Sequence, residues 1–292
     1  MDRLPVRSVV VGNIPALEIE NEWATACILL QGAQVLQFQP HDAVPLLWHN
    51  ADAEFELGKA VRAGIPVCWP WFGALEKNPE QVQASFPLEA AAAHGLARTE
   101  LWTPTSWSAD DEGIISVSLQ LQTLDDDFPL IPTLTVEVGK SLAISLTTVN
   151  RSEQVVSYSQ ALHSYFPTDD ISQTQVDGLD GCRYLDALDD WRLKTQSGPV
   201  LFSEETDRVY LGSPEQLNIS SSGSDSKTIE LHTSGSASTV VWNPWKDKSH
   251  WLSQFDDQAY KTMLCVETAT ADADAITLEP NQAHTLKLSI SL

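Results

Sequence analysis

The sequence has few cysteines, no long apolar run and no leader-like N-terminus. Its four cysteines show no CxxC or other tight spacing, which argues against a disulfide framework and against a zinc site. No stretch approaches the roughly 18 uninterrupted apolar residues of a membrane helix. The N-terminus lacks the apolar run and cleavage site of a signal peptide. We therefore expect a cytoplasmic protein with reduced thiols, no bound metal and no membrane partner.

Positive charge is also scarce. The chain has 17 Lys and Arg against 40 Asp and Glu, a formal net charge of −23. A field of that sign repels nucleic acid and anionic membrane surfaces, so neither is an expected partner. The acidic residues are spread along the chain, which is typical of a solvated surface. An anionic substrate would need a locally positive pocket to overcome this field.

The common motifs of nucleotide-dependent and metal-dependent enzymes are missing. The sequence contains no P-loop, GxGxxG, GxSxG, HExxH or EF-hand loop. Most nucleotide and zinc mechanisms therefore lose their usual sequence support, and we expect no cofactor.

Alternation of apolar and polar residues is the dominant pattern in the 292 residues. It is clearest at 115–121, 134–138 and 286–292, where it indicates strands with one buried face and one solvated face. Less regular strand candidates follow, and they are 24–30, 33–38, 142–149, 155–162, 239–242 and 263–267. The lengths of these segments and the turn-rich pieces between them predict an all-β fold, a large antiparallel β-sandwich.

Helical signals are few. A turn or two is expected at 185–194, and the segments 76–93 and 211–226 are expected to be loops because they are rich in Pro, Ser and Gly. No shift in composition marks a linker, and no internal repeat is visible. We therefore expect a single domain over residues 1–292, and we expect it to be a monomer.

Several charged residues lie inside apolar or aromatic segments. Arg62 lies in AVRAGIPVCWPWFG (60–73), and His94 and Arg98 lie in HGLAR (94–98). A guanidinium keeps its charge, so Arg62 needs an anionic or hydrogen-bonding partner. That partner is either a structural acid or a ligand such as a phosphate or a sugar hydroxyl.

Three further residues are candidates for chemistry. His163 in ALHSYF is either a core histidine or a catalyst, and Glu267 in MLCVET must be paired, protonated or functional if it is buried. Asp207 in TDRVY is either part of a surface salt bridge or a ligand-binding acid. Together, a His and a Glu supply a general acid and a general base, and arginines with aromatic rings supply a sugar site.

These segments resemble a known family. GIPVCWPWFG, HGLAR, ALHSYF, TDRVY, VWNPW and YKTMLCVETA occur here in the order seen in the glucose-6-phosphate 1-epimerases, a branch of the aldose 1-epimerase superfamily. The resemblance runs from about residue 20 to the C-terminus. It implies the galactose mutarotase type of β-sandwich, and it agrees with the alternation described above.

The resemblance also implies roles for individual residues. His163 and Glu267 match the catalytic pair of the family. The positions that match its substrate pocket, with the two arginines on the phosphate side, are Arg62, His94, Arg98 and Asp207. The implied partner is a small sugar phosphate, and the implied activity is α/β interconversion of glucose 6-phosphate. Ala93 stands where some relatives have Gln, so one polar contact to substrate is absent.

The implied mechanism is proton transfer without a metal. Glu267 takes the proton of the anomeric hydroxyl, and protonated His163 gives one to the ring oxygen, so the ring opens, rotates and closes on the other face. This requires a protonated His163 and an ionised Glu267, and proximity is expected to favour both states.

Other functions compete with this one. A mutarotase of unphosphorylated aldoses would share the chemistry, and a sugar-binding module would share the fold without needing an acid/base pair. A glycoside hydrolase would use two carboxylates rather than His and Glu. A regulatory interaction protein would be expected to carry an amphipathic or tail segment, and none is visible.

Overall fold

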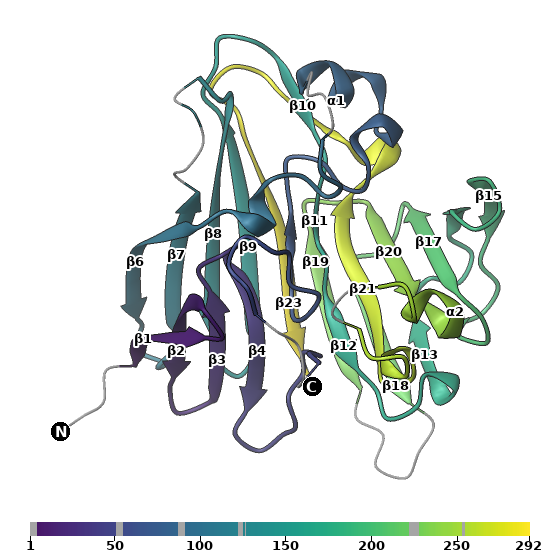
Figure 1. Cartoon of the computed structure of the whole chain (residues 1–292), viewed down its shortest axis with the longest axis horizontal. Helices are drawn as coiled ribbons and strands as arrows, with labels where there is room; N and C mark the ends of the chain where they lie inside the picture. The colour runs from purple at the N-terminus through teal and green to yellow at the C-terminus, as the bar shows by residue number, and fades with distance from the viewer. Residues whose placement is uncertain are drawn as a thin grey trace.

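Antiparallel strands make up most of the molecule, as the alternating pattern predicts (Figure 1). The computed structural model describes residues 5–50, 55–86, 91–121, 125, 127–221, 228–252 and 255–292. Within these residues every pairing between named strands is antiparallel. The all-β antiparallel prediction is confirmed.

The largest layer is a nine-stranded sheet whose longest strands alternate between buried and half-buried residues. Its strands in spatial order are β16 (Val200–Leu201), β13 (Thr174–Asp177), β18 (Gln216–Ser221), β19 (Ile229–Ser234), β23 (Ala283–Ser291), β9 (Leu142–Asn150), β8 (Leu130–Val138), β7 (Ile115–Leu121) and β6 (Trp102–Ala109). The alternation at 115–121, 134–138, 142–149 and 286–292 is that of its central strands.

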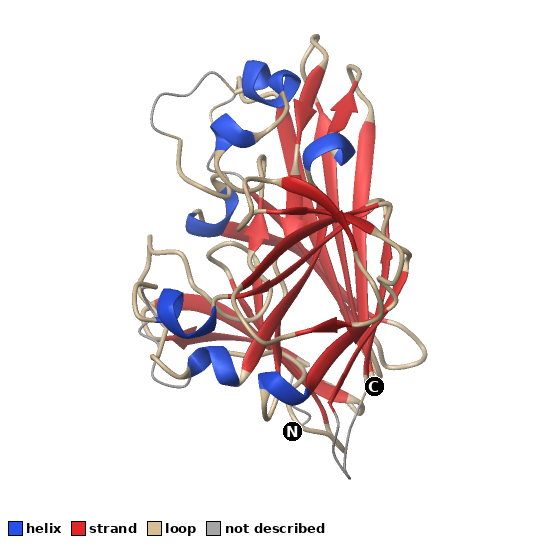
Figure 2. Ribbon diagram, turned by 90° about the vertical axis from the view of Figure 1, so that its right-hand side faces the viewer, coloured by secondary structure: helices blue, strands red, loops and turns tan. Residues whose placement is uncertain are grey.

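Two further sheets pack on this layer. One is four-stranded, with β1 (Val6–Val11), β2 (Ile14–Glu20), β3 (Ala24–Leu29) and β4 (Gln34–Pro40). The other is eight-stranded, with β15 (Arg192–Thr195), β14 (Arg183–Asp186), β17 (Thr206–Leu211), β20 (Ser238–Asn243), β21 (Met263–Thr270), β11 (Gln160–Leu162) and β5 (Val67–Cys68) in order, and β12 (Tyr165–Pro167) beside β21. Contacts of β3 with β8 and of β21 with β23 join both sheets to the nine-stranded one. Figure 2, in which strands are red, shows how much of the molecule the sheets make up.

A short ribbon of β10 (Val156–Tyr158) and β22 (Ile276–Leu278) completes the strands. The strand expected at 155–162 is thus divided between β10 and β11, which belong to different sheets. Its two halves pair with different strands, and tertiary packing rather than the local pattern decides which strand each half pairs with.

The core between the sheets is rich in tryptophan. Trp69, Trp71 and Trp102 are among the largest fully buried side chains. Each ring N–H has an acceptor: Trp69 donates to Thr148 Oγ1 on β9 at 3.0 Å, and the other two donate to backbone carbonyls. These bonds let the polar edge of each indole be buried without an unpaired donor.

The helices are short, and one of them corrects a prediction. They are α1 (Glu80–Ser85), α2 (Trp245–Ser249) and the 3₁₀ turns η1 (Leu75–Lys77), η2 (Ala97–Thr99), η3 (Ile171–Gln173), η4 (Ala259–Lys261) and η5 (Asp272–Asp274). The loop expected at 76–93 instead contains α1, because Val82 packs into the core and the Pro79 carbonyl, at the N-cap, accepts from the Val82 and Gln83 N–H groups. Residues 87–90 lie outside the described part of the chain.

Two other predictions are wrong. The helical turn expected at 185–194 is a hairpin of β14 and β15, in which Asp186 pairs with Arg192. The Asp186 carboxylate accepts bonds from the Leu188 backbone and from Lys194 Nζ, which fixes the turn. The loop expected at 211–226 contains β18, which is held between β13 and β19, while 222–227 lie outside the described residues.

None of the helices in the described ranges has the length and apolar character needed to cross a bilayer.

Candidate active site

Neighbouring segments of the eight-stranded sheet bring His163 and Glu267 together. His163 lies between β11 and β12, and both of these short strands pair with β21, which carries Glu267. The His163 N–H donates to the carbonyl of Pro66, just before β5, at 2.9 Å. The backbone on both sides of His163 is therefore held in the sheet, which fixes the point from which the imidazole side chain extends.

The two side chains form a buried pair. His163 Nε2 is 3.5 Å from Glu267 Oε1, and the residues are 9% and 2% exposed. The other polar atom of each, His163 Nδ1 and Glu267 Oε2, is buried without a hydrogen-bond partner. Buried polar atoms without partners are rare in proteins, and a bound ligand is one way to satisfy them.

Aromatic rings enclose this pair. The His163 ring stacks on Tyr165, with centroids 4.9 Å apart and planes 9° apart, and Trp242 presents an edge at 6.2 Å. Sequence reasoning missed both as site residues, although they lie in ALHSYF and VWNPW. The signal that could have identified Tyr165 is its position two residues after His163, on the same side of an extended segment.

Burial acts against the charged forms that the expected mechanism requires of the pair. Burial lowers the pKa of His163 well below its usual value, and the neighbouring His94, Arg98 and Arg62 lower it further. Burial likewise raises the pKa of Glu267 well above its usual value, and the Asp207 carboxylate adds to this. Burial therefore disfavours the charged form of both groups.

Arg62 lies in the same pocket. Its charge and its hydrogen bond to Tyr165 act to lower the pKa of that phenol, against the burial that raises it. The segment after Arg62 is held against β12, since the Tyr165 N–H donates to the Gly64 carbonyl at 2.9 Å. Gly64 has φ +55°, and a Cβ there would meet the Val35 carbonyl oxygen at 2.1 Å, so this approach requires glycine.

The HGLAR segment is fastened to the turn after β5. The N–H groups of Leu96 and Ala97 both donate to the Trp69 carbonyl, at 2.8 and 3.1 Å. Gly95 has φ +76°, and a Cβ there would meet the Trp69 carbonyl oxygen at 2.1 Å. The two motifs GIPVCWPWFG and HGLAR thus meet through their backbones, and this places His94 and Arg98 beside the pair.

His94 is a neutral hydrogen-bond donor in this site. Its Nδ1 accepts from the Gly73 N–H at 3.3 Å, so the proton of the neutral ring is on Nε2. Burial lowers the pKa of His94 to about 3, with help from Arg98 and Arg62. The ring lies 5.7 Å from that of His163, centroid to centroid.

Arg98 is half-buried and is held in part by the backbone. One guanidinium nitrogen donates to the Ala93 carbonyl at 2.8 Å. Its charge acts on both His94 and His163, which puts it within electrostatic reach of the pair. The structure thus brings four of the sequence-predicted residues together around the fifth, Glu267: they are Arg62, His94, Arg98 and His163.

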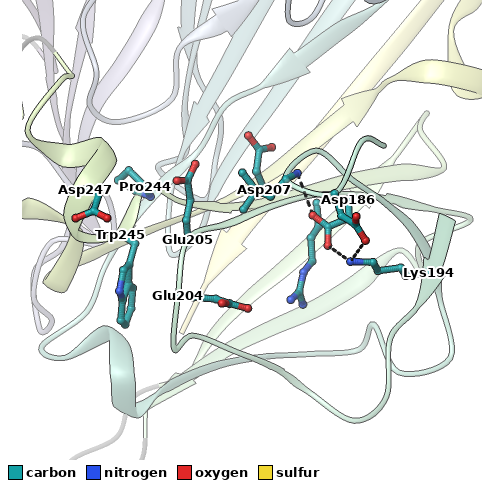
Figure 3. A pocket seen from close by; sticks show the side chains of 11 residues that line it. Asp186, Lys194, Glu204, Glu205, Asp207, Pro244, Trp245 and Asp247 are labelled. Carbon is teal, nitrogen blue, oxygen red and sulfur yellow. Dashed lines mark hydrogen bonds and ion pairs between the residues drawn. The ribbon is translucent and has the colours of Figure 1, made fainter. Parts of the chain in front are cut away.

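Asp207 lies at the opposite edge of the site. Its β17 position faces Trp242 across the sheet, and Lys248 Nζ approaches its Oδ2 at 3.8 Å. Burial raises the pKa of Asp207, and Lys248 opposes that shift. A cavity of about 400 Å³ opens on this side, lined by Glu204, Glu205, Trp245 and other residues (Figure 3). His163 and Glu267 do not line it, so Asp207 stands between this acidic cavity and the pair.

The pair also belongs to a set of atoms that could hold a metal ion. One ligand atom each from His163, Cys265 and Glu267 lie within 4.8 Å of one another. The sequence did not predict this set, because the cysteine is two residues from the glutamate on one strand while the histidine comes from another.

Comparisons with known proteins agree with this geometry. The family model described as aldose 1-epimerase matches residues 15–291. A protein of Cenchrus ciliaris named "putative glucose-6-phosphate 1-epimerase" is 33% identical over 278 residues, which cover 90% of this chain and 80% of that relative. A Salmonella typhimurium protein of the same name is 31% identical over 92% of this chain and 88% of its own length.

Solved structures give the same fold. The crystal structure of a "putative mutarotase" from Salmonella typhimurium superposes with a TM-score of 0.86 at 26% identity, covering 100% of this chain and 95% of that one. A galactose mutarotase-like protein from Clostridium acetobutylicum has a TM-score of 0.71 at 15% identity, covering 98% and 97% of the two chains, and shows the fold alone. The galactose mutarotase-like β-sandwich is confirmed, and the chain belongs to the aldose 1-epimerase family.

Proposed function

We propose that this protein interconverts the α and β anomers of a hexose 6-phosphate, with glucose 6-phosphate as the first substrate to test. The observation that carries the proposal is the buried pair of His163 and Glu267, whose second polar atoms have no protein partner. An acid and a base with unfilled hydrogen-bonding capacity suit a substrate that both accepts and gives a proton. The relatives' names supply the sugar phosphate.

Ring opening moves one proton from the anomeric hydroxyl to the ring oxygen. Glu267 as carboxylate takes the hydroxyl proton, and His163 as imidazolium gives one to the ring oxygen while the C1–O5 bond breaks. This leaves the open-chain aldehyde with a protonated Glu267 and a neutral His163. Rotation about C1–C2 and the reverse transfers then give the other anomer.

A neutral His163 and a protonated Glu267, the state of the open-chain stage, hold the same number of protons as the ion pair, and one transfer between them converts one state into the other. Burial disfavours the charged form of each group, which acts in the direction of the open-chain stage. The ion pair needed at the start forms as substrate binds.

A phosphate would promote that change. Arg62 and Arg98 both hold the pKa of His163 down, and a phosphate dianion between them would offset their charge. Binding of the sugar phosphate therefore raises the pKa of His163 and prepares it as the acid. The same two guanidinium groups supply the locally positive pocket that the acidic surface requires.

Exchange measurements test the proposal. In two-dimensional exchange NMR, added protein is expected to accelerate α/β interconversion of glucose 6-phosphate in the presence of a chelator, because the mechanism uses only protein groups. Complete loss of this activity in chelator would overturn the metal-free mechanism. No acceleration with any hexose 6-phosphate would overturn the substrate.

The net charge favours a second candidate, a mutarotase of unphosphorylated aldoses. A surface with a net charge of −23 repels sugar phosphates but not neutral sugars. Glucose and galactose in the same assay decide between them: a kcat/KM for a free sugar equal to or above that for glucose 6-phosphate would favour this candidate.

A further inference from the structure

The reaction proposed above does not use Cys265, yet this thiol lies beside the acid/base pair. Cys265 is fully buried on β21, two residues before Glu267, so both side chains extend from the same face of the sheet. The simplest role for such a thiol is that of a small apolar side chain packed among aromatic rings, and Trp242 and Tyr165 do contact its cluster. Its position relative to His163 and Glu267 suits a second role.

The separations in this set match those of a tetrahedral metal site. Nitrogen and oxygen ligands lie about 2.0–2.1 Å from zinc, so two of them at a tetrahedral angle are about 3.4 Å apart. His163 Nε2 and Glu267 Oε1 are 3.5 Å apart. The thiol completes a set within 4.8 Å, and its sulfur would move closer to the other two ligand atoms to reach the usual zinc–sulfur distance of about 2.3 Å.

Two features point to a ligand in this place. His163 and Glu267 are both more than nine-tenths buried, and Glu267 Oε2 has no hydrogen-bond partner, so it is open to a second bond to the metal, whereas the unpartnered histidine atom is Nδ1 and not the Nε2 that faces Oε1. A thiolate and a carboxylate carry two negative charges that attract a divalent cation against the nearby charge of Arg62 and Arg98, and imidazole with thiolate is the donor set that zinc favours.

We propose that a thiophilic divalent cation, Zn²⁺ or its analogue Co²⁺, binds to His163, Cys265 and Glu267 and blocks the site. The metal replaces the proton of the thiol and that of the carboxylic acid, both of which leave to solvent, and it takes the imidazole lone pair. No oxidation or reduction occurs. The bound ion occupies the gap in which the sugar would exchange protons, so metal and substrate exclude one another.

Direct binding tests the site without any sugar. Chelator-treated, reduced full-length protein is titrated with Co²⁺, and we expect a thiolate-to-cobalt charge-transfer band with a stoichiometry of one, displaced by Zn²⁺. Absence of this band would overturn the proposal. Binding of one Zn²⁺ per chain without a thiolate ligand would overturn it as well. This outcome does not depend on the reaction that the protein catalyses.

Cysteine variants locate the ligand. Cys265→Ser, or Cys265→Ala if the serine variant is poorly folded, is expected to lose the band and to weaken metal binding by about 100-fold or more, since even residues outside the ligand shell contribute about 10–100-fold. Cys68→Ala is the matched control, because Cys68 is an equally buried thiol on β5 of the same sheet, separated from β21 by β11, and is not part of the set. Equal losses in both variants, with circular dichroism confirming folded protein, would overturn the assignment.

Inhibition is the second measurement, and it alone rests on the proposed function. The ratio of anomer-exchange rates with and without Zn²⁺ is compared among wild type, the Cys265 variant and the Cys68 variant, so that changes in basal rate cancel. We expect wild type and the Cys68 variant to be inhibited competitively with glucose 6-phosphate, and the Cys265 variant to need at least about 100-fold more metal. A charge-transfer band with no inhibition in an active enzyme would refute the blocking role. A band in an inactive protein would instead count against the proposed function.

Discussion

Burial is the largest influence on the pKa values of the two catalytic candidates. His163 and Glu267 are close enough to form an ion pair, yet the pKa of the histidine is lowered and that of the glutamate is raised. In a site of low polarity the charged form of each group loses hydration, which disfavours that form. A polar ligand that restores hydrogen bonds to them therefore changes their protonation as well as their contacts.

Variants of the pair test its role in proton transfer. His163→Ala and Glu267→Gln are each expected to lower kcat by at least about 100-fold while the protein stays folded, because each removes one proton-transfer group. The matched controls are His232→Ala and Glu230→Gln on β19, which leave the pair intact. Exchange NMR gives the rates, and losses below about tenfold in both site variants would favour a sugar-binding module.

Variants of the two arginines test the phosphate assignment. Arg62→Met or Arg98→Met is expected to raise KM for glucose 6-phosphate by about ten- to 150-fold, since a charge-assisted bond contributes about 1.5–3 kcal/mol. The KM for free glucose should change little. Arg183→Met, at an exposed residue of β14, is the control. Equal KM changes for both sugars would contradict a role for these arginines in binding the phosphate.

At the scale of elements, the site depends on close backbone approaches between segments that are distant in sequence. Gly95 lies against the Trp69 carbonyl, and Gly64 lies against Val35 at the start of β4. These two contacts bring the histidine and arginine motifs to the edge of the sheet that carries Glu267. A side chain at either glycine would separate the segments.

Two glycine substitutions separate backbone conformation from this close contact. Gly95 and Gly181 have nearly the same positive φ, +76° and +78°, but only at Gly95 would a Cβ meet other atoms within 4 Å. Gly181→Ala is expected to cost about 1–2 kcal/mol of unfolding free energy from conformation alone. Gly95→Ala is expected to cost about 3–5 kcal/mol and to lower activity, because HGLAR must move. Urea unfolding measures both, and equal costs would argue against the close contact.

At the scale of the whole molecule, the net charge of −23 acts against an anionic substrate and against compactness. The local field of Arg62 and Arg98 acts over a few ångströms, whereas the surface field acts over the Debye length, which is about 8 Å at physiological salt. Salt should therefore screen the repulsion at long range more than the attraction within the pocket.

This difference predicts a biphasic response to salt. Raising sodium chloride from about 0.01 to 0.15 M should lower KM for glucose 6-phosphate by about two- to threefold and raise the melting temperature, because the surface charge is screened. Sulfate at the same ionic strength should raise KM, since it competes for the arginines. The KM of free glucose serves as the control, and a monotonic rise of the glucose 6-phosphate KM in chloride would contradict a repulsive surface field.

Alternating residues determined the fold class from the sequence alone. The strands at 115–121 and 142–149 could be predicted because each buries one face, and a pattern of period two is a local property of the chain. The hairpin at 183–195 and the helix at 80–85 could not, because 183–195 carries no clear period of two, 80–85 lies in a segment rich in Pro and Ser, and the contacts of each with the rest of the fold decide its form. The single domain and the monomer predicted from the sequence stay predictions.

The candidate site divides in the same way. The sequence alone identified Arg62, His94, Arg98, His163, Asp207 and Glu267, because charged side chains stand out in apolar segments and in recognisable motifs. Only the tertiary structure decided that His163 faces Glu267, that Tyr165 and Trp242 enclose them, and that Cys265 joins them. It also showed that burial acts against the expected charged forms, since desolvation depends on the whole shell of atoms around a group and not on its neighbours in sequence.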